Sequence, residues 1–320
     1  MILFTHKSCL DGFACKTVFS YLKNYNEDSQ VFTYSYRELD RMIPQITNSI
    51  DKNETIYIID INYKKLEEIV ELKKDYPNLV YIDHHKYNEH YYIQGTGVIK
   101  LQNIEYKDDN GDIWLTCPVK NIKAGGILFY EYAKNNDLLK KMWPAERDRL
   151  INFITLASEY DTWLWKENNN LEARDLARIF YNVPEEIFEE NLTKYLCDSS
   201  VPLFNTFFKQ YLDLMEKQKE KKYKYISNNC EVHKDVEGNK YIWFQMERAD
   251  SDLLNKMLLE DDRYKDIDYI ACFSYLGKAV SFRSRDDFDV SRIAKKYGGG
   301  GHHSAAACPI PEHFLNNFKI

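Results

Sequence analysis

Acidic, imidazole and thiol side chains follow three short apolar runs in the first 85 residues of the chain. They form three groups, one after each run: His6, Cys9 and Asp11; Asp60; and Asp83, His84 and His85. Carboxylates brought to one point repel each other, and a divalent cation offsets that repulsion. Because mixed Asp and His ligands suit Mn²⁺, Fe²⁺ or Zn²⁺ better than Ca²⁺, we expect such a cation wherever the three groups meet.

Local sequence patterns indicate that the groups do meet. The apolar runs at 2–5, 55–59 and 79–82 are typical of buried strands, and segments with helical spacing, 12–25 and 63–76, separate them. This alternation predicts an α/β fold with a parallel sheet between helices, whose strands end at one ligand-binding edge. A single aspartate at a strand end is usually a helix N-cap or turn residue, but three groups at successive strand ends favour a metal site.

The pattern changes beyond the third group. Residues 98–116 predict a β-hairpin with its turn at Asn110-Gly111, and 124–135 and 145–160 predict helices. The charged, amphipathic stretch 205–225 predicts a long solvated helix that could join two domains. We therefore expect three parts: a metal-binding catalytic domain over 1–204, a connecting helix over 205–225 and a smaller α/β substrate-binding domain over 226–320.

A glycine-bearing, locally basic segment lies near the end of the chain. Gly298 to Gly301 precede His302, and residues 278–303 hold six Lys or Arg against three Asp. Glycines let a backbone approach a ligand and expose N–H groups to anions, and the small residues that follow are expected to open a helix. The alternative is a flexible loop. A phosphate clamp explains the pattern better, with these candidate residues: Arg283, Ser284, Gly299, Gly300, Gly301 and His302.

Composition narrows the possible partners. The 43 basic and 50 acidic side chains leave a net charge of −7, which argues against coating long nucleic acid but permits a short phosphorylated ligand. No apolar run reaches the roughly 18 residues that a membrane span needs, and the N-terminal residues do not resemble a signal peptide. Seven cysteines spread over 320 residues argue against a disulfide framework, so we expect a reducing, cytoplasmic setting and no membrane partner.

Five motifs occur in the order found in one known family. They are His6-x-x-Cys9-x-Asp11-Gly12, Ile-Ile-Asp60, Asp83-His84-His85-Lys86, Tyr160-Asp161-x-Trp163 and Gly-Gly-Gly-Gly-His302. The fourth carries little information alone, since Asp161 could be a surface residue. Together the motifs resemble the DHH phosphoesterases, which include RecJ-like exonucleases, oligoribonucleases and cyclic-dinucleotide phosphodiesterases. The last motif is similar to that of the DHH-associated C-terminal domain.

The resemblance implies a set of roles. Two Mn²⁺ ions would be bound, one by His6 and Cys9 and the other by Asp11, His84 and Asp161, with Asp60 bridging them. His85 would face the substrate or the bridging water, and Asp83 would orient His84. Arg283 and His302 would contact the substrate phosphate or nucleotide.

One residue departs from the family pattern. Many members have aspartate where this chain has Cys9, although some similar sequences carry cysteine. Because a thiolate suits Zn²⁺ or Fe²⁺ better than Mg²⁺, the identity of the first cation stays open among Mn²⁺, Zn²⁺, Fe²⁺ and Mg²⁺.

The function expected on this basis is metal-dependent hydrolysis. The preferred substrates are short oligonucleotides or linear or cyclic dinucleotides, attacked by a water that two metals activate. Two alternatives stay open. One is a hydrolase of pyrophosphate or another small phosphate, and the other is a nucleotide-binding protein whose catalytic site Cys9 has weakened.

Overall fold

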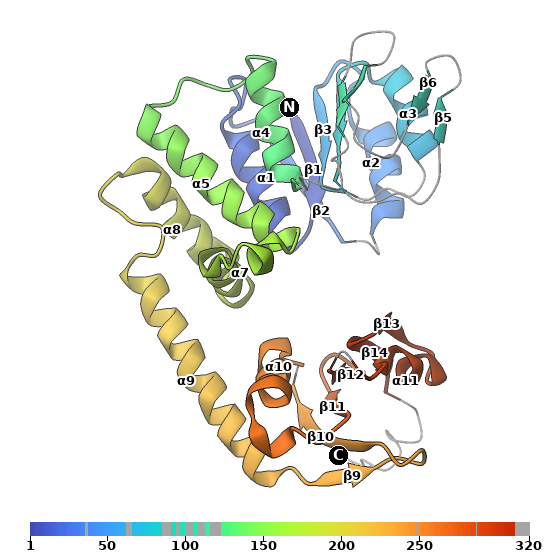
Figure 1. The fold of residues 1–320 in the computed structure, drawn as a ribbon. Coiled ribbons are helices and arrows are strands. Elements are labelled where there is room, and N and C mark those ends of the chain that lie inside the picture. Colours follow the sequence, from blue (N-terminus) through green and yellow to red (C-terminus); the bar gives the residue numbers. More distant parts are fainter. Residues whose placement is uncertain are drawn as a thin grey trace. The chain divides into compact units, whose positions relative to one another are not determined.

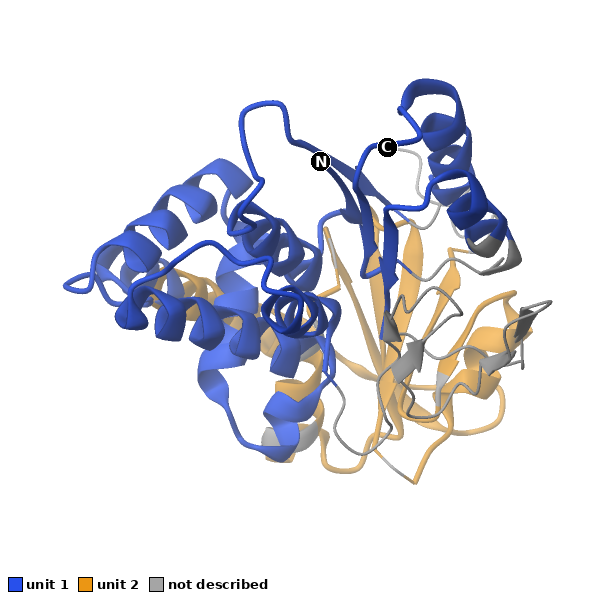
Figure 2. Ribbon diagram, turned by 90° about the horizontal axis from the view of Figure 1, so that it is seen from above, with its two compact units in different colours: residues 1–212 blue, residues 213–320 orange. Residues whose placement is uncertain are grey.

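The computed structural model describes residues 1–35, 38–61, 66–84, 91–93, 97–99, 105–107, 113–115, 123–247, 249–285 and 287–310. The chain forms two compact units, residues 1–212 and 213–320 (Figure 2). The division falls inside helix α9 (Thr206–Asn229), which covers the stretch predicted to be a long helix.

A six-stranded sheet lies at the centre of the first unit. In order across the sheet, its strands are β2 (Gln30–Tyr34), β1 (Ile2–His6), β3 (Ile56–Ile59), β4 (Leu79–Ile82), β8 (Ile113–Leu115) and β7 (Glu105–Lys107). The strands from β2 to β8 are parallel, and β7 is antiparallel to β8. The predicted parallel sheet is therefore confirmed.

Helices cover both faces of this sheet (Figure 1). On one face lie α1 (Leu10–Ser20), α4 (Gly125–Asn135), α5 (Pro144–Asp161), α7 (Leu171–Asn182) and α8 (Glu185–Cys197), and on the other lie α2 (Met42–Ser49) and α3 (Leu66–Asp75). Alternate residues of β1 enter the two cores: Leu3 packs on the α1 side, and Phe4 packs on the α2 side. Burial on both faces explains why these strands read as continuous apolar runs.

The segment between β4 and α4 differs from the prediction. Strands β7 and β8 form the expected antiparallel pair, but β6 (Gly97–Ile99) pairs instead with β5 (Tyr91–Ile93). The predicted 98–116 hairpin is therefore correct only for the pairing of 105–107 with 113–115, and its expected turn at Asn110-Gly111 lies outside the described residues. Strand β8 also continues the central sheet as the neighbour of β4, a long-range pairing that hairpin patterns do not reveal.

The second unit has its own six-stranded sheet. The order is β13 (Gly300–His302), β14 (Ala305–Pro309), β12 (Ala279–Ser284), β11 (Tyr269–Ser274), β10 (Lys240–Met246) and β9 (Val232–Lys234). Only β10 and β11 pair in parallel among these described strands. Helix α10 (Ser251–Glu260) packs on one face, and α11 (Val290–Lys296) packs on the other. The unit is α/β, as predicted.

The residues after the glycine run correct one expectation. They were expected to open a helix, but Ala305–Pro309 is the strand β14. It pairs with β12 and β13, and its alternate residues Ala306 and Cys308 enter the core against α11. Sheet pairing and burial override the helix propensity of three consecutive alanines.

Within the second unit, a charged network holds the later part of helix α9 against the turn that follows α10. Arg263 donates from Nε and Nη2 to the Asp261 carboxylate at 2.9 and 2.7 Å, and the Tyr223 hydroxyl of α9 donates to the same group at 2.6 Å. Arg263 first, and Tyr223 with it, lower the pKa of Asp261 from 3.8 to about 2. The carboxylate form is therefore stabilised by folding.

Substituting Asp261→Asn is expected to lower the free energy of unfolding by about 1–2 kcal/mol at pH 7, allowing for the half-exposed Arg263. A lowered carboxyl pKa stabilises above the ordinary value, and the benefit disappears as the pH falls from 3.8 toward about 2. Denaturant unfolding followed by circular dichroism at pH 7 and pH ~2.5 measures the difference. An equal effect at both pH values would contradict this explanation.

Within the described ranges, none of the helices combines enough length with enough apolar character to cross a membrane.

Candidate metal centre

The three predicted groups lie at the carboxyl ends of adjacent strands. His6 is the last residue of β1, Asp60 follows β3, and Asp83 and His84 follow β4. The chain passes from β1 outward to β2 on one side and returns to β3 on the other. In open α/β sheets, ligands bind where the strand order reverses in this way.

Two sets of ligand atoms meet there and share one residue. Single donor atoms of His6, Cys9 and Asp60 lie within 4.8 Å of one another, and so do those of Asp11, Asp60 and His84. Asp11 and Asp60 are almost fully buried, with exposed fractions of 0% and 1%. The sheet edge therefore holds a histidine, thiol and carboxylate set beside a histidine and carboxylate set, with Asp60 common to both.

Asp161 completes the cluster from the end of α5. Its Oδ2 lies 3.3 Å from His84 Nε2, and its Oδ1 lies 3.7 Å from Cys9 Sγ. His84 Nε2 also lies 3.2 Å from Asp60 Oδ1. The structure thus brings together six residues that the sequence singled out: His6, Cys9, Asp11, Asp60, His84 and Asp161.

The electrostatics show an excess of buried acid. Burial and the charges of Asp60 and Asp161 raise the pKa of Asp11 well above its usual value, and burial with the same acids raises the pKa of the Cys9 thiol. Burial alone would lower the pKa of His84, but the hydrogen bond and charge of Asp60, with the charges of Asp11 and Asp161, raise it to about 10. A divalent cation would relieve these conflicts by stabilising the carboxylates and the thiolate and by binding the neutral imidazole of His84 in place of its proton.

Asp60 also shows that the residues fit a cation. Its Oδ2 is buried and has no hydrogen-bond partner among the described residues. Its backbone has φ 58°, a left-handed conformation that is costly for a residue other than glycine. An unpartnered buried carboxylate oxygen is expensive unless an ion or ligand satisfies it, and strained backbone often marks functional positions. The donors present, carboxylate, imidazole and thiol, suit Mn²⁺, Zn²⁺ or Fe²⁺.

Helix α4 supplies residues that sequence reasoning missed. The Gly126 N–H donates to both oxygens of Asp11, at 3.1 and 3.3 Å, so Asp11 accepts at the start of α4. The Ala124 N–H donates to the Ser158 hydroxyl of α5 at 2.9 Å. A Cβ added to Gly125 would lie 2.8 Å from Asp60 Cβ and 3.0 Å from Asp11 Oδ2. The sequence signal for this contact was the Gly-Gly pair at the start of the predicted helix, because glycines let a helix backbone approach neighbouring groups closely.

Gly12 serves a similar purpose in the first motif. A Cβ there would lie 2.2 Å from the carbonyl oxygen of His6, closer than any real contact. The absence of a side chain lets α1 begin directly against the end of β1. This packing places Asp11 of α1 next to His6.

The roles predicted for two catalytic residues, Asp83 and His85, are not tested by the structure. Asp83 is buried directly after β4, with an exposed fraction of 1%, and its orienting role stays a prediction. His85 lies outside the described residues, so its predicted contact with substrate or water stays a prediction too.

The predicted clamp residues lie in the second unit, on β12, on β13 and just before β13. Arg283 Nη1 donates to the Phe282 carbonyl at 2.8 Å, and the buried Ser284 hydroxyl donates to the Phe288 carbonyl at 2.5 Å. A Cβ on Gly299 would lie 2.1 Å from the Ala307 carbonyl oxygen, whereas one on Gly300 would meet nothing within 4 Å. Gly301 has φ 143° and pairs with Ala306, and His302 pairs with Ala305. Gly299 is therefore required by close strand packing, while the space beside Gly300 is open.

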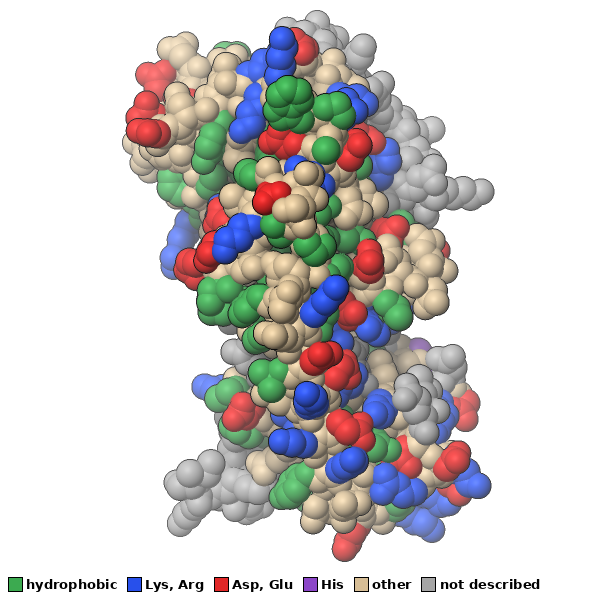
Figure 3. Space-filling view, turned by 90° about the vertical axis from the view of Figure 1, so that its left-hand side faces the viewer, with side chains coloured by type: hydrophobic (Ala, Val, Ile, Leu, Met, Phe, Trp, Pro, Cys, Tyr) green, Lys and Arg blue, Asp and Glu red, His purple; other side chains and the backbone are tan. Residues whose placement is uncertain are grey.

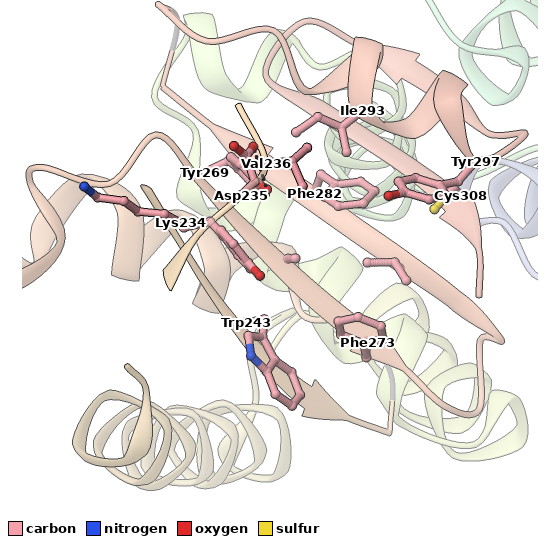
Figure 4. A pocket seen from close by; sticks show the side chains of 13 residues that line it. Lys234, Asp235, Val236, Trp243, Tyr269, Phe273, Phe282, Ile293, Tyr297 and Cys308 are labelled. Atoms are coloured by element: carbon pink, nitrogen blue, oxygen red, sulfur yellow. Dashed lines mark hydrogen bonds between the residues drawn. The ribbon is translucent and has the colours of Figure 1, made fainter. Parts of the chain in front are cut away.

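An aromatic cavity of about 370 Å³ lies on the α11 face of the second sheet (Figure 4). Its lining includes Tyr269, Phe282 and Tyr297. Successive strand residues point to opposite faces, so Arg283 points away from the face that carries Phe282. Burial lowers the pKa of Arg283. The charge of Cys272, which packs on the α10 side of the sheet, opposes that shift. Within the described part of the chain, none of the predicted clamp residues lines this cavity.

Comparisons with known proteins agree with this architecture. Residues 238–319 match the DHHA1 domain family. The chain is 26% identical over 322 residues to the oligoribonuclease NrnB of Bacillus subtilis (strain 168), which covers 99% of this chain and 74% of that protein. The fold resembles the pGpG-specific phosphodiesterase PggH from Vibrio cholerae, with a TM-score of 0.53 at 11% identity and 99% and 95% coverage. It also resembles exonuclease RecJ bound to manganese, with a TM-score of 0.52 at 12% identity and 99% and 87% coverage.

Residues 238–319 therefore carry a DHHA1 domain, and the chain as a whole is similar to an oligoribonuclease in sequence. The Asp-His-His triplet that gives the DHH phosphoesterases their name stands after β4, and its first histidine belongs to the acidic cluster. The DHHA1 match spans β10 to β14, so every predicted clamp residue falls inside that domain.

Proposed function

We propose that this protein is a hydrolase of ester bonds that cleaves the phosphodiester bonds of short oligonucleotides or dinucleotides. One observation carries the proposal: two sets of potential metal ligands meet at one sheet edge and share Asp60, whose buried Oδ2 has no hydrogen-bond partner among the described residues. Two cations held a few ångströms apart by a shared carboxylate form the kind of site that serves phosphoryl chemistry in many phosphatases and nucleases.

The names of the relatives support the same chemistry. NrnB is an oligoribonuclease, PggH is a phosphodiesterase specific for pGpG, and RecJ is an exonuclease. The structure of RecJ was determined with manganese bound, which makes Mn²⁺ the first choice for this chain as well. We propose two such ions. The thiol of Cys9 keeps Zn²⁺ and Fe²⁺ as alternatives for the set that contains His6.

Each group of residues has a part in the proposed reaction. When bound, the divalent cations lower the pKa of water and neutralise phosphoryl oxygens. His6, Cys9 and Asp60 would hold one cation, and Asp11, Asp60, His84 and Asp161 would hold the other. The Gly126 N–H fixes the orientation of Asp11, and Asp83 would support His84. In the second unit, Arg283, the backbone N–H groups around Gly300 and His302 would bind the substrate phosphate, with Ser284, Gly299 and Gly301 shaping that segment.

Charge distribution favours a short substrate. The chain carries a net charge of −7. On the face drawn in Figure 3, Lys and Arg side chains are interspersed with Asp and Glu side chains. A protein that binds long nucleic acid without sequence preference needs a continuous basic groove. A short ligand, bound at one site by cations and a few basic groups, needs no such groove. The expected cytoplasmic location stays a prediction.

A substrate panel with and without metal tests this function. The purified chain is dialysed against EDTA and assayed with labelled dinucleotides, bis-nitrophenyl phosphate and pyrophosphate, before and after Mn²⁺ is restored. We expect dinucleotide cleavage to fall by about 100-fold or more without metal and to recover with it. Cleavage of pyrophosphate alone would show that the phosphodiester assignment is wrong. Dinucleotide binding without any turnover in Mn²⁺ would favour the nucleotide-binding alternative.

A further inference from the structure

Aromatic side chains gather beside the candidate metal centre without belonging to it. We define the aromatic shelf as Tyr160, Trp163, Trp165 and Tyr181. The ring of Tyr160 stacks on Trp165, with centroids 6.4 Å apart and planes 17° apart, and lies 6.1 Å from the ring of Tyr181. Lys166 Nζ lies 4.3 Å from the Trp163 ring centroid and 5.6 Å from that of Trp165, which joins the two indoles.

Much of the shelf faces solvent. The exposed fractions are 63% for Trp163 and 48% for Tyr181. Large aromatic side chains gain stability mainly by burial, so these two rings leave apolar area available to a ligand.

The backbone at Trp163 is strained to present the indole. Trp163 has φ 65° and ψ 3°, the left-handed conformation, which is an outlier for a bulky side chain. The exposed indole gains little from burial in return for that strain. Strained backbone in a residue that packs against little of its own chain points to a functional role.

Hydrogen bonds hold the shelf in place. The Glu159 carboxylate accepts from Asn168 Nδ2 at 3.3 Å and from Asn170 Nδ2 at 2.7 Å. Asn170 in turn accepts from the Ala173 N–H at the start of α7. The Thr162 hydroxyl donates to the Ser158 carbonyl at 2.7 Å. The turn that carries Trp163, including the short helix α6 (Leu164–Glu167), is therefore ordered before any ligand binds.

The shelf adjoins the metal ligands directly. Tyr160 and Trp163 flank Asp161, whose Oδ1 lies 3.7 Å from Cys9 Sγ. Tyr181 adjoins the same segment through Tyr160, since the two ring centroids lie 6.1 Å apart. A nucleotide whose phosphate lay at the cations would carry its base one sugar away, so a base-binding ring is sought within a few residues of a metal ligand, as Trp163 is of Asp161.

We propose that the aromatic shelf stacks the nucleobase of the nucleotide whose phosphate lies at the metal centre. Trp163 provides the principal stacking face, and Tyr181 offers a second exposed ring beside Tyr160. The inference rests on the proposed function for its substrate class and deepens it, because it assigns a base-binding subsite to the first unit. Every base has a π face, so this subsite accepts any base, as a nuclease for short oligonucleotides of mixed sequence requires. Lys166 adds positive charge beside the indole, where the negatively charged ligand enters.

Binding of two small probes tests the shelf without requiring turnover. The dissociation constants of AMP and of ribose 5-phosphate are measured by calorimetry on the full chain with Mn²⁺. The variants are Trp163→Asn, which suits the left-handed backbone but lacks a ring, and Trp163→Phe, which keeps a ring. Trp143→Asn is the matched control, because Trp143 is 81% exposed and precedes the opposite end of α5.

The wild-type chain is expected to bind AMP about tenfold more tightly than ribose 5-phosphate, the usual magnitude of one stacked base. Trp163→Asn should bring that ratio close to one, whereas Trp163→Phe and Trp143→Asn should preserve most of it. A ratio near one in the wild type, or an unchanged ratio in Trp163→Asn, would overturn the inference. Turnover of bis-nitrophenyl phosphate is measured in a separate assay. Absence of that turnover would refute the proposed function, whereas the ratio of AMP affinity to ribose 5-phosphate affinity decides the role of the shelf.

Discussion

Replacing Asp60 by asparagine is expected to lower the rate of phosphodiester hydrolysis by about 10³-fold or more, since metal assistance contributes several kcal/mol to such reactions. Asp60 belongs to both sets of candidate ligands, so its loss weakens both cation sites at once. Steady-state cleavage of a labelled dinucleotide in Mn²⁺ measures the effect. Asp28→Asn, an exposed change of the same chemistry, serves as the control and should retain full activity.

Asparagine is the sharper substitution because it keeps the fold. It has the shape of aspartate and tolerates the left-handed backbone, with φ 58°, better than alanine does. Removing one buried negative charge relieves its repulsion with Asp11, but it also removes the charge that Asp60 offers to His84. Because the two effects oppose each other, we expect metal-free Asp60→Asn to unfold within a few degrees of metal-free wild type. Wild-type turnover in this variant would refute the shared role of Asp60.

Gly125→Ala is expected to lower both stability and activity, against the usual trend for a helix. In an ordinary helix interior, alanine is more favourable than glycine by about 1 kcal/mol. At Gly125 the added methyl would lie 2.8 Å from Asp60 Cβ and 3.2 Å from Asp60 Cα. Either α4 or the strained Asp60 backbone must move, which typically costs about 1–3 kcal/mol. Because the same shift displaces Asp60 from the cluster, turnover should fall with stability.

Denaturant unfolding and dinucleotide cleavage measure the two effects of Gly125→Ala. Gly300→Ala is the control for stability, because a Cβ there meets nothing within 4 Å, and it should change the free energy of unfolding by less than about 1 kcal/mol. A stabilised, fully active Gly125→Ala protein would show that α4 does not pack against the metal centre as described.

The sequence predicts those parts of the molecule that follow from local patterns. Asp60 and His84 could be placed at one edge because parallel strands end together. Asp161 could not be placed in this way, since it reaches the cluster from the end of α5 and only its motif pointed to it. The role of Gly125 and Gly126 depends on how α4 docks against Asp11, which is a tertiary contact.

The errors have the same origin. Residues 305–309 favour a helix locally, but pairing with β12 and β13 makes them a strand. Strand β6 pairs with β5 rather than with the chain that follows it. In both cases the partner strand decides the structure, and a single-segment pattern contains no information about the partner.

Manganese binding at equilibrium tests the central claim most directly. Metal-free wild type and Asp60→Asn are titrated with Mn²⁺, and free ion is followed by electron paramagnetic resonance. A shared Asp60 between two ligand sets predicts two bound ions per wild-type chain and a marked loss of affinity for both in Asp60→Asn. Failure of the wild-type chain to bind Mn²⁺, Zn²⁺ or Fe²⁺, or unchanged binding in Asp60→Asn, would contradict the account.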